Sequence, residues 1–420
     1  MNKIKKTILK NGIRIVTKKI PYVRSVSLGM WVNTGARDET LTENGLSHFI
    51  EHMIFKGTLR RSAYQIAKEF DAIGGQNNAF TSMENTCYYA KVMDTHLDTM
   101  TDILLDTFLN SVFDAAEVER ERTVILQEIG MVEDTPDEHI HILSGNTFWG
   151  DHPLGRSVLG AREKLLAFNS DHLKGFFHRF YQPDRMVVSA AGNIEHNRLV
   201  ELMGPALSSI KPGEGFPERF PPNGRSLVEA HYRQLEQTHI CAGTPGLSIT
   251  DPKRFAFSLM NTILGGNMSS RLFQEIRERH GLAYSVYSFT SPHVDTGMFG
   301  VYAGVDPKRA VEATALVLKE LKKVKEKQVD QAELDDAKEF TKGSLFLASE
   351  SIDNQMVRLA QNEMHYNEYI PLESVVKNID AVTPEEIQDL ANELFKADQL
   401  ALTLLGPITD KAPYEDLLVL

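Results

Sequence analysis

The hydrophobic and polar positions of the chain repeat with two different periods, which predict short strands and long amphipathic helices. Alternation with a period of two predicts strands at Ser25–Thr34, Thr86–Val92, Ala283–Thr290 and Gly297–Gly304. Apolar residues three and four positions apart predict helices at Asn44–Phe55, Ala63–Ile73, Thr95–Leu109, Ala115–Ile129, Arg309–Lys325 and Gln331–Ala348. The strands cluster instead of alternating one for one with helices. We therefore expect an α+β fold in which mostly antiparallel sheets are covered by helices.

A segment near the midpoint of the chain breaks this pattern. Between Ile210 and Arg225 there are four prolines and three glycines in sixteen residues. Such a composition supports neither a helix nor a central strand, and it predicts an extended linker. The length of 420 residues fits two domains. We place an N-terminal domain at 1–211, the linker at 212–227 and a C-terminal domain at 228–420.

The two predicted domains resemble each other in sequence. Phe180–Ile194 matches Leu394–Ile408 at an offset of 214, and Phe113–Val118 matches Val329–Leu334 at an offset of 216. Two matches at nearly the same offset indicate a tandem duplication. The halves are therefore expected to share one fold.

The composition excludes several classes of protein. A formal charge of -12 from 45 basic and 57 acidic residues argues against nucleic acid as a partner, since phosphate binding needs a basic surface. The longest apolar runs are shorter than the roughly 18 residues of a membrane span. The N-terminal segment has no apolar core of a secretory signal. Cys87 and Cys241, the two cysteines, cannot form a disulfide framework and indicate a reducing compartment.

The segment His48-Phe49-Ile50-Glu51-His52 carries the strongest chemical signal. Histidines four residues apart lie on one face of a helix, so both imidazoles can reach one zinc ion. Glu51 lies beside the same face and can act as a base toward a metal-bound water. This is the H-x-x-E-H inverzincin arrangement.

A third protein ligand is expected for a catalytic zinc, and the sequence leaves its identity open. The predicted helix around 117–133 carries five glutamates: Glu117, Glu119, Glu121, Glu128 and Glu133. Glu121 and Glu128 are two turns apart and share a face. A solvated acidic helix face is the alternative interpretation. His139 and His141 are two apart, which suits no single helical face, and are not expected to be ligands.

The segments NGLSHFIEHMIFKGT and ERTVILQE, with Glu128 lying 76 residues after His52, resemble the pitrilysin/insulinase metallopeptidases. In its length the chain resembles one branch of this family, whose members are similar to the mitochondrial processing peptidase. The resemblance implies that His48, His52 and Glu128 bind one Zn2+ per chain and that Glu51 is the general base. It also implies that Glu121 supports the site without binding the metal.

The same resemblance assigns residues to the substrate. Gly74–Tyr89 is similar to the edge strand of the family, where the backbone around Asn78 and Ala79 pairs with an extended peptide. Arg277 and Tyr284 resemble the pair that binds substrate and stabilises the transition state. Their guanidinium and phenol can donate hydrogen bonds to a tetrahedral oxyanion.

The C-terminal half is not expected to bind metal. The positions equivalent to His48 and His52 fall in Asn261–Met268, which has no histidine, and the equivalent of Glu128 falls near Ser344. In double-length relatives the zinc site and the Arg/Tyr pair lie in opposite halves of a clamshell. The resemblance therefore implies a half-clamshell that forms a homodimer, in which Arg277 and Tyr284 act in trans.

These observations predict a zinc endopeptidase that hydrolyses short unstructured peptides or presequence-like segments within a closed chamber. Two alternatives remain open: an inactive structural subunit of the same fold, and a maturase dedicated to one peptide precursor. An intact zinc motif argues against the first. We expect a location in the bacterial cytoplasm, or in a mitochondrion only if a presequence has been removed.

Overall fold

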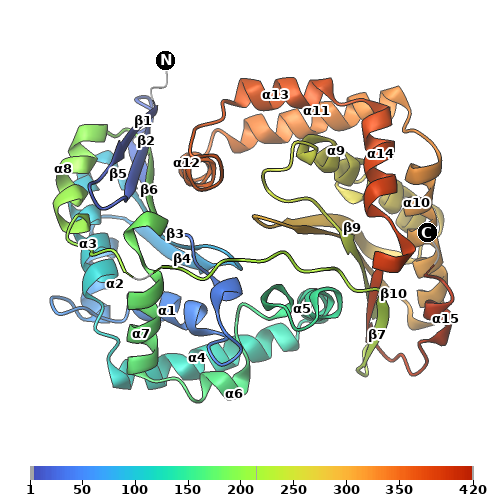
Figure 1. Cartoon of the computed structure of the whole chain (residues 1–420), viewed down its shortest axis with the longest axis horizontal. Coiled ribbons are helices and arrows are strands. Elements are labelled where there is room, and N and C mark those ends of the chain that lie inside the picture. The colour runs from blue at the N-terminus through green and yellow to red at the C-terminus, as the bar shows by residue number, and fades with distance from the viewer. Residues whose placement is uncertain (1–3, 214, 419–420) are drawn as a thin grey trace. The chain divides into compact units, whose positions relative to one another are not determined.

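The computed structural model describes residues 4–213 and 215–418, and these form two compact units (Figure 1). The described residues do not include 1–3, 214 and 419–420. These belong to the predicted N-terminal domain, linker and C-terminal domain, respectively. The first unit contains the described residues up to 130, together with 157–219 and 347–369. The second contains 131–156, 220–346 and those from 370 onward.

The first unit is built on a six-stranded sheet of order β1-β2-β6-β3-β5-β4. Its strands are β1 (Ile4–Ile8), β2 (Arg14–Lys19), β3 (Ser25–Val32), β4 (Gln76–Thr81), β5 (Thr86–Met93) and β6 (Met186–Gly192). The β2–β6 pair is parallel and the other pairs are antiparallel. Strand β4 pairs with β5 in the register Asn78↔Tyr89 and Ala79↔Tyr88, and it forms one edge of the sheet.

Helices cover the sheet of the first unit because each presents one apolar face to it. They are α1 (Leu46–Ile54), α2 (Ala63–Ala72), α3 (Leu97–Asn110), α4 (Ala115–Glu133), α6 (Arg162–Leu165), α7 (Ser170–Phe180), α8 (His196–Leu207) and α12 (Ile352–Tyr366). The main core joins the sheet to α1, α3, α7 and α8, with Phe49, Tyr88 and Phe176 buried in it. Helix α4 continues past the boundary of the unit at its last three residues.

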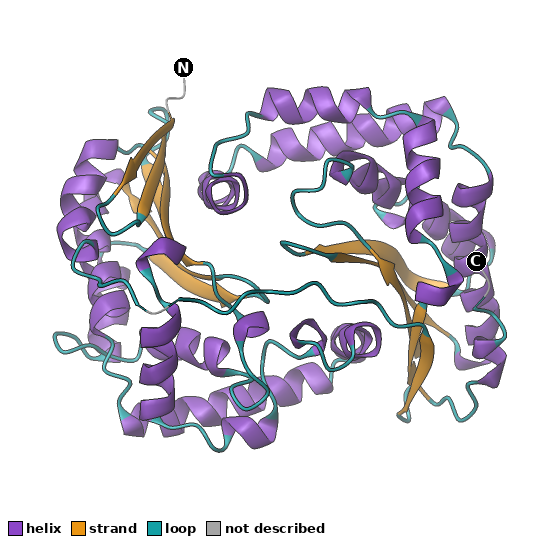
Figure 2. Ribbon diagram, in the orientation of Figure 1, coloured by secondary structure: helices purple, strands orange, loops and turns teal. Residues whose placement is uncertain are grey.

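The second unit repeats this architecture (Figure 2). Its five-stranded sheet has the order β7-β11-β8-β10-β9, with β7–β11 parallel and the other pairs antiparallel. The strands are β7 (Leu227–Tyr232), β8 (Thr238–Pro245), β9 (Ala283–Pro292), β10 (Gly297–Val305) and β11 (Ala401–Gly406). The helices are α5 (Pro136–Trp149), α9 (Arg254–Gly265), α10 (Ala310–Glu326), α11 (Gln331–Ala348), α13 (Leu372–Ala381), α14 (Pro384–Leu394) and α15 (Ala412–Glu415), with a π-helical segment at Phe273–Arg279.

The order of strands confirms the expected α+β fold with two similar halves. The order β2-β6-β3-β5-β4 in the first sheet corresponds to β7-β11-β8-β10-β9 in the second, including the position of the parallel pair. Helices α4 and α11 begin 216 residues apart, at Ala115 and Gln331, which is the offset read from the sequence. In the described part of the chain, every helix is too short or too polar to traverse a bilayer.

Each half of the chain supplies one helix to the other half's sheet. Helix α12, from the C-terminal half, packs on β6, β3 and β2, where its Met356 joins Trp31 and Val187 in a second core. Helix α5, from the N-terminal half, packs on β11 and β8, where Ile140 joins Leu405. The compact units are therefore discontinuous and differ from the continuous domains 1–211 and 228–420 of the sequence prediction. An amphipathic pattern shows that a helix has an apolar face, but not which sheet that face covers.

The predicted linker is likewise divided between the units. The described residues up to Arg219 belong to the first unit, and those from Phe220 belong to the second. Among its described residues before β7, 212–213 and 215–226, the segment has no helix or strand, as its prolines and glycines predict.

Candidate metal centre

Helix α1 is a short, deeply buried helix that carries the H-x-x-E-H motif. Its apolar residues Phe49, Ile50 and Met53 are fully enclosed in the core. Their packing prevents rotation of the helix, so the direction of its opposite face is fixed. The helix begins after Gly45, whose φ of +105° is favourable for glycine. A Cβ at this position would also lie 2.9 Å from the Cα of Gly160.

A buried carboxylate occupies the N-terminus of this helix. Glu39 Oε2 accepts a hydrogen bond from Gly45 N at 2.8 Å, and Oε1 accepts one from Ser47 N at 2.7 Å. The side-chain amide of Asn44 also donates to Glu39, at 3.2 Å. Glu39 therefore satisfies two of the backbone N–H groups that a helix start leaves unpaired.

His48, His52 and Glu128 converge from two helices. The Nε2 atoms of His48 and His52 lie 3.6 and 3.5 Å from Glu128 Oε2, and the two imidazole centroids are 4.7 Å apart. Glu128 reaches them from helix α4. Among residues 4–213 and 215–418, these three form the cluster of His, Cys, Asp and Glu side chains whose ligand atoms all lie within 4.8 Å of one another.

The donor set fits a zinc ion. Two donors about 2.1 Å from a tetrahedral zinc are about 3.4 Å apart, close to the two nitrogen–oxygen separations here. Two imidazole nitrogens and one carboxylate oxygen are also the ligand types of catalytic zinc sites, which leave a fourth position for water. The three side chains are therefore arranged in a way that can hold such an ion without large movement.

The protonation tendencies of the three side chains suit metal binding. Burial, assisted by His52, lowers the pKa of His48 to about 4, which keeps its imidazole neutral. The hydrogen bond from His52 lowers the pKa of Glu128. Burial lowers the pKa of His52, but hydrogen bonds to Glu128 and Glu121 outweigh this and raise it. A metal ion therefore competes with a proton for His52.

Glu121 contacts both His52 and Lys56. Glu121 Oε2 lies 3.1 Å from His52 Nδ1, and its Oε1 accepts from Lys56 Nζ at 2.5 Å. In the neutral imidazole of His52, an Nδ1–H directed at this carboxylate leaves Nε2 with its lone pair toward the cluster. His48 differs, because its Nδ1 is buried without a hydrogen-bond partner.

Glu51 lies on the same helix, largely buried. Burial raises the pKa of its carboxyl, and polar contact with Thr81 and the charge of His52 oppose this shift. Thr81 is the last residue of β4, so the end of this edge strand lies beside Glu51.

Comparisons with known proteins identify a family of metallopeptidases that this chain matches. Residues 14–162 match the model of the insulinase family, peptidase family M16, and residues 167–340 match the M16 inactive domain. A protein named as an uncharacterized zinc protease of Bacillus subtilis is 41% identical over 413 residues, covering 96% of this chain and 98% of that protein. Another, of Streptomyces coelicolor, is 40% identical, with coverages of 97% and 90%.

The chain belongs to the insulinase family, peptidase family M16.

Solved structures agree with the fold of the M16 family. A protease from Helicobacter pylori superposes with a TM-score of 0.89 at 22% identity, covering 96% of this chain and 100% of that chain. A peptidase M16 inactive domain from Pseudomonas fluorescens has a TM-score of 0.90 at 19% identity, with coverages of 97% and 98%. At these identities the likeness concerns the fold alone.

The remaining predicted residues of this M16 chain occupy two places. In the first unit, Asn78 and Ala79 lie on the edge strand β4, which contacts α1. The side chain of Asn78 accepts a hydrogen bond from Ala79 N at 2.9 Å. In the second unit, the guanidinium of Arg277 lies 4.9 Å from the ring centroid of Tyr284, which is largely exposed. The structure thus makes Arg277 and Tyr284 neighbours.

Several functional neighbours were not found from the sequence. Glu39 contacts the backbone at the start of α1, Lys56 contacts Glu121, and Thr81 contacts Glu51. The spacing of these residues in the chain carries no signal. His141 Nε2 lies 2.8 Å from the Tyr287 hydroxyl in the second unit. Cys87 and Cys241 are both buried.

Proposed function

We propose that this chain is a zinc-dependent endopeptidase of the M16 family, with His48, His52 and Glu128 as metal ligands and Glu51 as general base. The observation that carries the proposal is the convergence of two imidazole nitrogens on one carboxylate oxygen, at 3.6 and 3.5 Å, beside Glu51. Family membership and relatives named as zinc proteases support it.

The chemistry divides between the metal and the protein. When bound, zinc polarises a scissile carbonyl and lowers the pKa of water. Glu51 accepts a proton from the attacking water and passes it to the leaving amine. Its raised pKa helps the first transfer, because a carboxylate whose pKa lies closer to neutrality is a stronger base toward water. Glu121 holds the His52 ring in the tautomer that presents Nε2 to the metal.

The substrate in this proposal is an extended peptide added to the edge of β4. Main-chain hydrogen bonds to an edge strand are available to every peptide sequence, so this mode selects unfolded segments and not particular side chains. Asn78 Oδ1 accepts a hydrogen bond from the N–H of Ala79. We propose that a bound peptide carbonyl replaces this internal contact.

Arg277 and Tyr284 complete the proposal. Their stacked guanidinium and phenol can donate hydrogen bonds to the oxyanion that forms at the scissile carbonyl. We propose that they do so in trans within a homodimer, which encloses short unstructured or presequence-like peptides in a chamber.

The test is cleavage of an internally quenched fluorescent peptide with wild type, with Glu51→Gln, and with chelated protein before and after zinc is restored. The proposal expects activity that the chelator removes, zinc restores and Glu51→Gln reduces by at least about a hundredfold with zinc still bound. Exposed Glu368→Gln is the matched control. Wild type that binds no zinc would contradict the metal site. Full activity of Glu51→Gln would contradict the role of the base.

A further inference from the structure

The last linker residue of the first unit is anchored in a buried polar network. Arg219 forms two parallel bonds to Asp38, Nε–Oδ1 at 2.8 Å and Nη2–Oδ2 at 2.7 Å. The Asp38 side chain is only 1% exposed. A two-bond guanidinium–carboxylate pair is strongly directional, so its geometry fixes the position of both partners.

Arg219 also joins two separate segments of the first unit. Its Nη1 donates to Asn33 Oδ1 at 3.0 Å, and its Nη2 donates to the backbone oxygen of Glu84 at 3.1 Å. One side chain from the linker therefore bridges the loop after β3, residues 33–39, and the turn between β4 and β5, residues 82–85.

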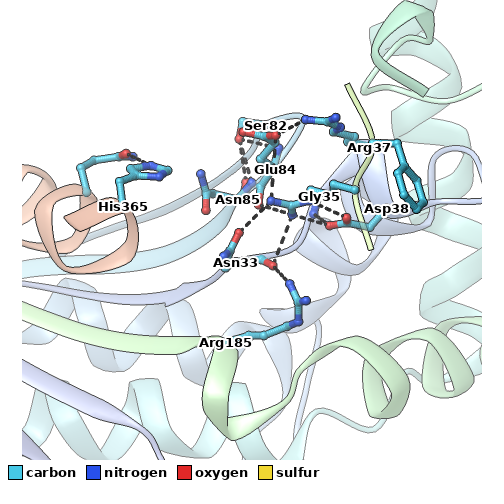
Figure 3. A network of polar contacts seen from close by, with 12 residues as sticks. Asn33, Gly35, Arg37, Asp38, Ser82, Glu84, Asn85, Arg185 and His365 are labelled. Atoms are coloured by element: carbon cyan, nitrogen blue, oxygen red, sulfur yellow. Dashed lines mark hydrogen bonds and ion pairs between the residues drawn. The ribbon is translucent and has the colours of Figure 1, made fainter. Parts of the chain in front are cut away.

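The loop and the turn are themselves in close contact (Figure 3). Arg37 donates to the Glu84 carboxylate at 2.6 Å, and the backbone N–H of Arg37 donates to Met83 O at 2.7 Å. Gly35 is required at the point of approach, because a Cβ there would lie 2.2 Å from Ser82 O. The N–H of Gly35 donates to Asp38 at 3.1 Å.

Both segments lead directly to the candidate metal centre. Loop 33–39 ends at Glu39, the carboxylate that accepts from Gly45 N and Ser47 N at the start of α1. His48, Glu51 and His52 follow on that helix. The turn 82–85 follows Thr81, which lies beside Glu51.

We infer that Arg219 is a positioning residue for the M16 site: by holding Asp38 and the turn at Glu84, it fixes Glu39 and Thr81 and thereby the start of the helix that carries the ligands and base. This inference rests on the proposed function for its catalytic consequence. The anchoring itself rests on the contacts of Arg219 alone.

Removal of the guanidinium has a defined structural consequence. Of the three hydrogen bonds that Gly35 and Arg219 donate to Asp38, only the one from Gly35 would remain. A buried carboxylate with too few hydrogen-bond donors destabilises the folded state. Loop 33–39 must then shift toward water, which moves Glu39 away from the helix start. A lysine cannot replace the arginine fully, because one ammonium does not reproduce two parallel bonds and the contacts to Asn33 and Glu84.

The test uses the full-length protein with zinc added and four variants: Arg219→Met, Arg219→Lys, Asp38→Asn and the Asp38→Asn/Arg219→Met double variant. Arg120→Met is the matched control, since Arg120 pairs with Glu117 at the exposed surface of α4. Hydrogen exchange of a peptide covering 44–55 is compared with that of α7, and zinc transfer to a chromogenic chelator is timed.

For Arg219→Met we expect faster exchange at 44–55 with α7 unchanged, and zinc transfer on the order of ten- to a hundredfold faster. The kcat falls by a similar factor while KM stays within about twofold. The double variant is closer to wild type than Arg219→Met, because it leaves no buried unpaired carboxylate. Arg219→Lys lies between wild type and Arg219→Met.

Two outcomes overturn the inference. One is an Arg219→Met protein whose exchange and zinc transfer equal those of Arg120→Met. The other is faster exchange in α7 to the same degree as in 44–55, which indicates loss of general stability. If Arg219→Met does not fold, Arg219→Lys decides by the same comparison. Hydrogen exchange can be measured without any cleavage of peptide. A wild type without peptidase activity would therefore refute the proposed function, while the exchange data would still test the positioning role of Arg219.

Discussion

His52 Nδ1 lies 3.1 Å from Glu121 Oε2, on the opposite side of the ring from the nitrogen that faces Glu128. The two glutamates are seven residues apart on α4 and approach the same imidazole from its two nitrogens. One helix thus supplies a metal-ligand candidate and the carboxylate that orients its neighbouring ligand.

Glu121→Gln is expected to weaken zinc binding by about 10- to 100-fold, because an amide no longer fixes the Nδ1–H tautomer of His52 through a charged acceptor. Competition against a zinc-selective chelator measures this affinity. Glu119→Gln, an exposed change on the same helix, is the control. Equal affinities of the two variants would remove the orienting role of Glu121.

Zinc is expected to raise the unfolding temperature of the wild type. A ligand that binds only the folded state adds about 2.7 kcal/mol at a free concentration 100 times its Kd. His48→Ala removes a proposed ligand and should abolish the zinc-dependent shift. Thermal unfolding with and without zinc, followed by circular dichroism, makes the comparison. A shift of the same size in His48→Ala would show that the stabilising zinc binds elsewhere.

The Glu39 carboxyl is expected to make stability depend on pH. Burial raises its pKa from 4.5 to about 7 in the folded chain, against the lowering by hydrogen bonds from Ser47 and Gly45. A raised pKa gives a contribution to stability that is complete below pH 4.5 and is lost as the pH rises through about 7. The loss amounts to about 3 kcal/mol, at 1.36 kcal/mol per pKa unit.

The measurement is the difference in free energy of unfolding between wild type and Glu39→Gln at several pH values. This difference should change by about 3 kcal/mol between pH 4.5 and 7.5 in the direction that disfavours wild type at high pH. Glu368→Gln, at the surface, should give a constant difference. A flat profile for Glu39→Gln would show that its carboxyl does not titrate in this interval.

Met356→Ala is expected to destabilise the first unit by about 2–5 kcal/mol, because Met356 is enclosed between α12 and the sheet. Denaturant unfolding followed by the fluorescence of Trp31, in a Trp149→Phe background, reports this unit. Met93→Ala, at an exposed position of β5, should change stability by less than about 0.5 kcal/mol. An equally small effect of Met356→Ala would contradict the packing of α12 on this sheet.

The sequence predicted the elements that depend on local pattern. The strand expected at Thr86–Val92 is observed as Thr86–Met93, and the helix expected at Gln331–Ala348 has the same bounds in the structure. The i,i+4 histidines of α1 do share a face, since their rings lie 4.7 Å apart. Helical periodicity and strand alternation are properties of neighbouring residues, so one chain is enough to read them.

Contacts between distant segments were beyond such reasoning. Glu121 and Glu128 share a face of α4, but periodicity alone does not show which of them meets the histidines. The Arg219–Asp38 pair joins residues 181 positions apart and has no local signature. The pattern that predicts a helix at Asn44–Phe55 does not show that the Glu39 carboxylate accepts hydrogen bonds from the backbone at its start.

The exchange of α5 and α12 bears on how the protein is made. The sheet of the unit that carries the M16 motif is complete in sequence by Gly192, yet the helix α12 that packs on it is not fully translated until residue 366. A nascent chain that has emerged from the ribosome only as far as the linker exposes the apolar surface around Trp31, Val187 and Ala191. Such a surface favours aggregation or chaperone binding until the last quarter of synthesis covers it. A gene fragment ending at the linker would encode every proposed zinc ligand and still yield a poorly soluble product.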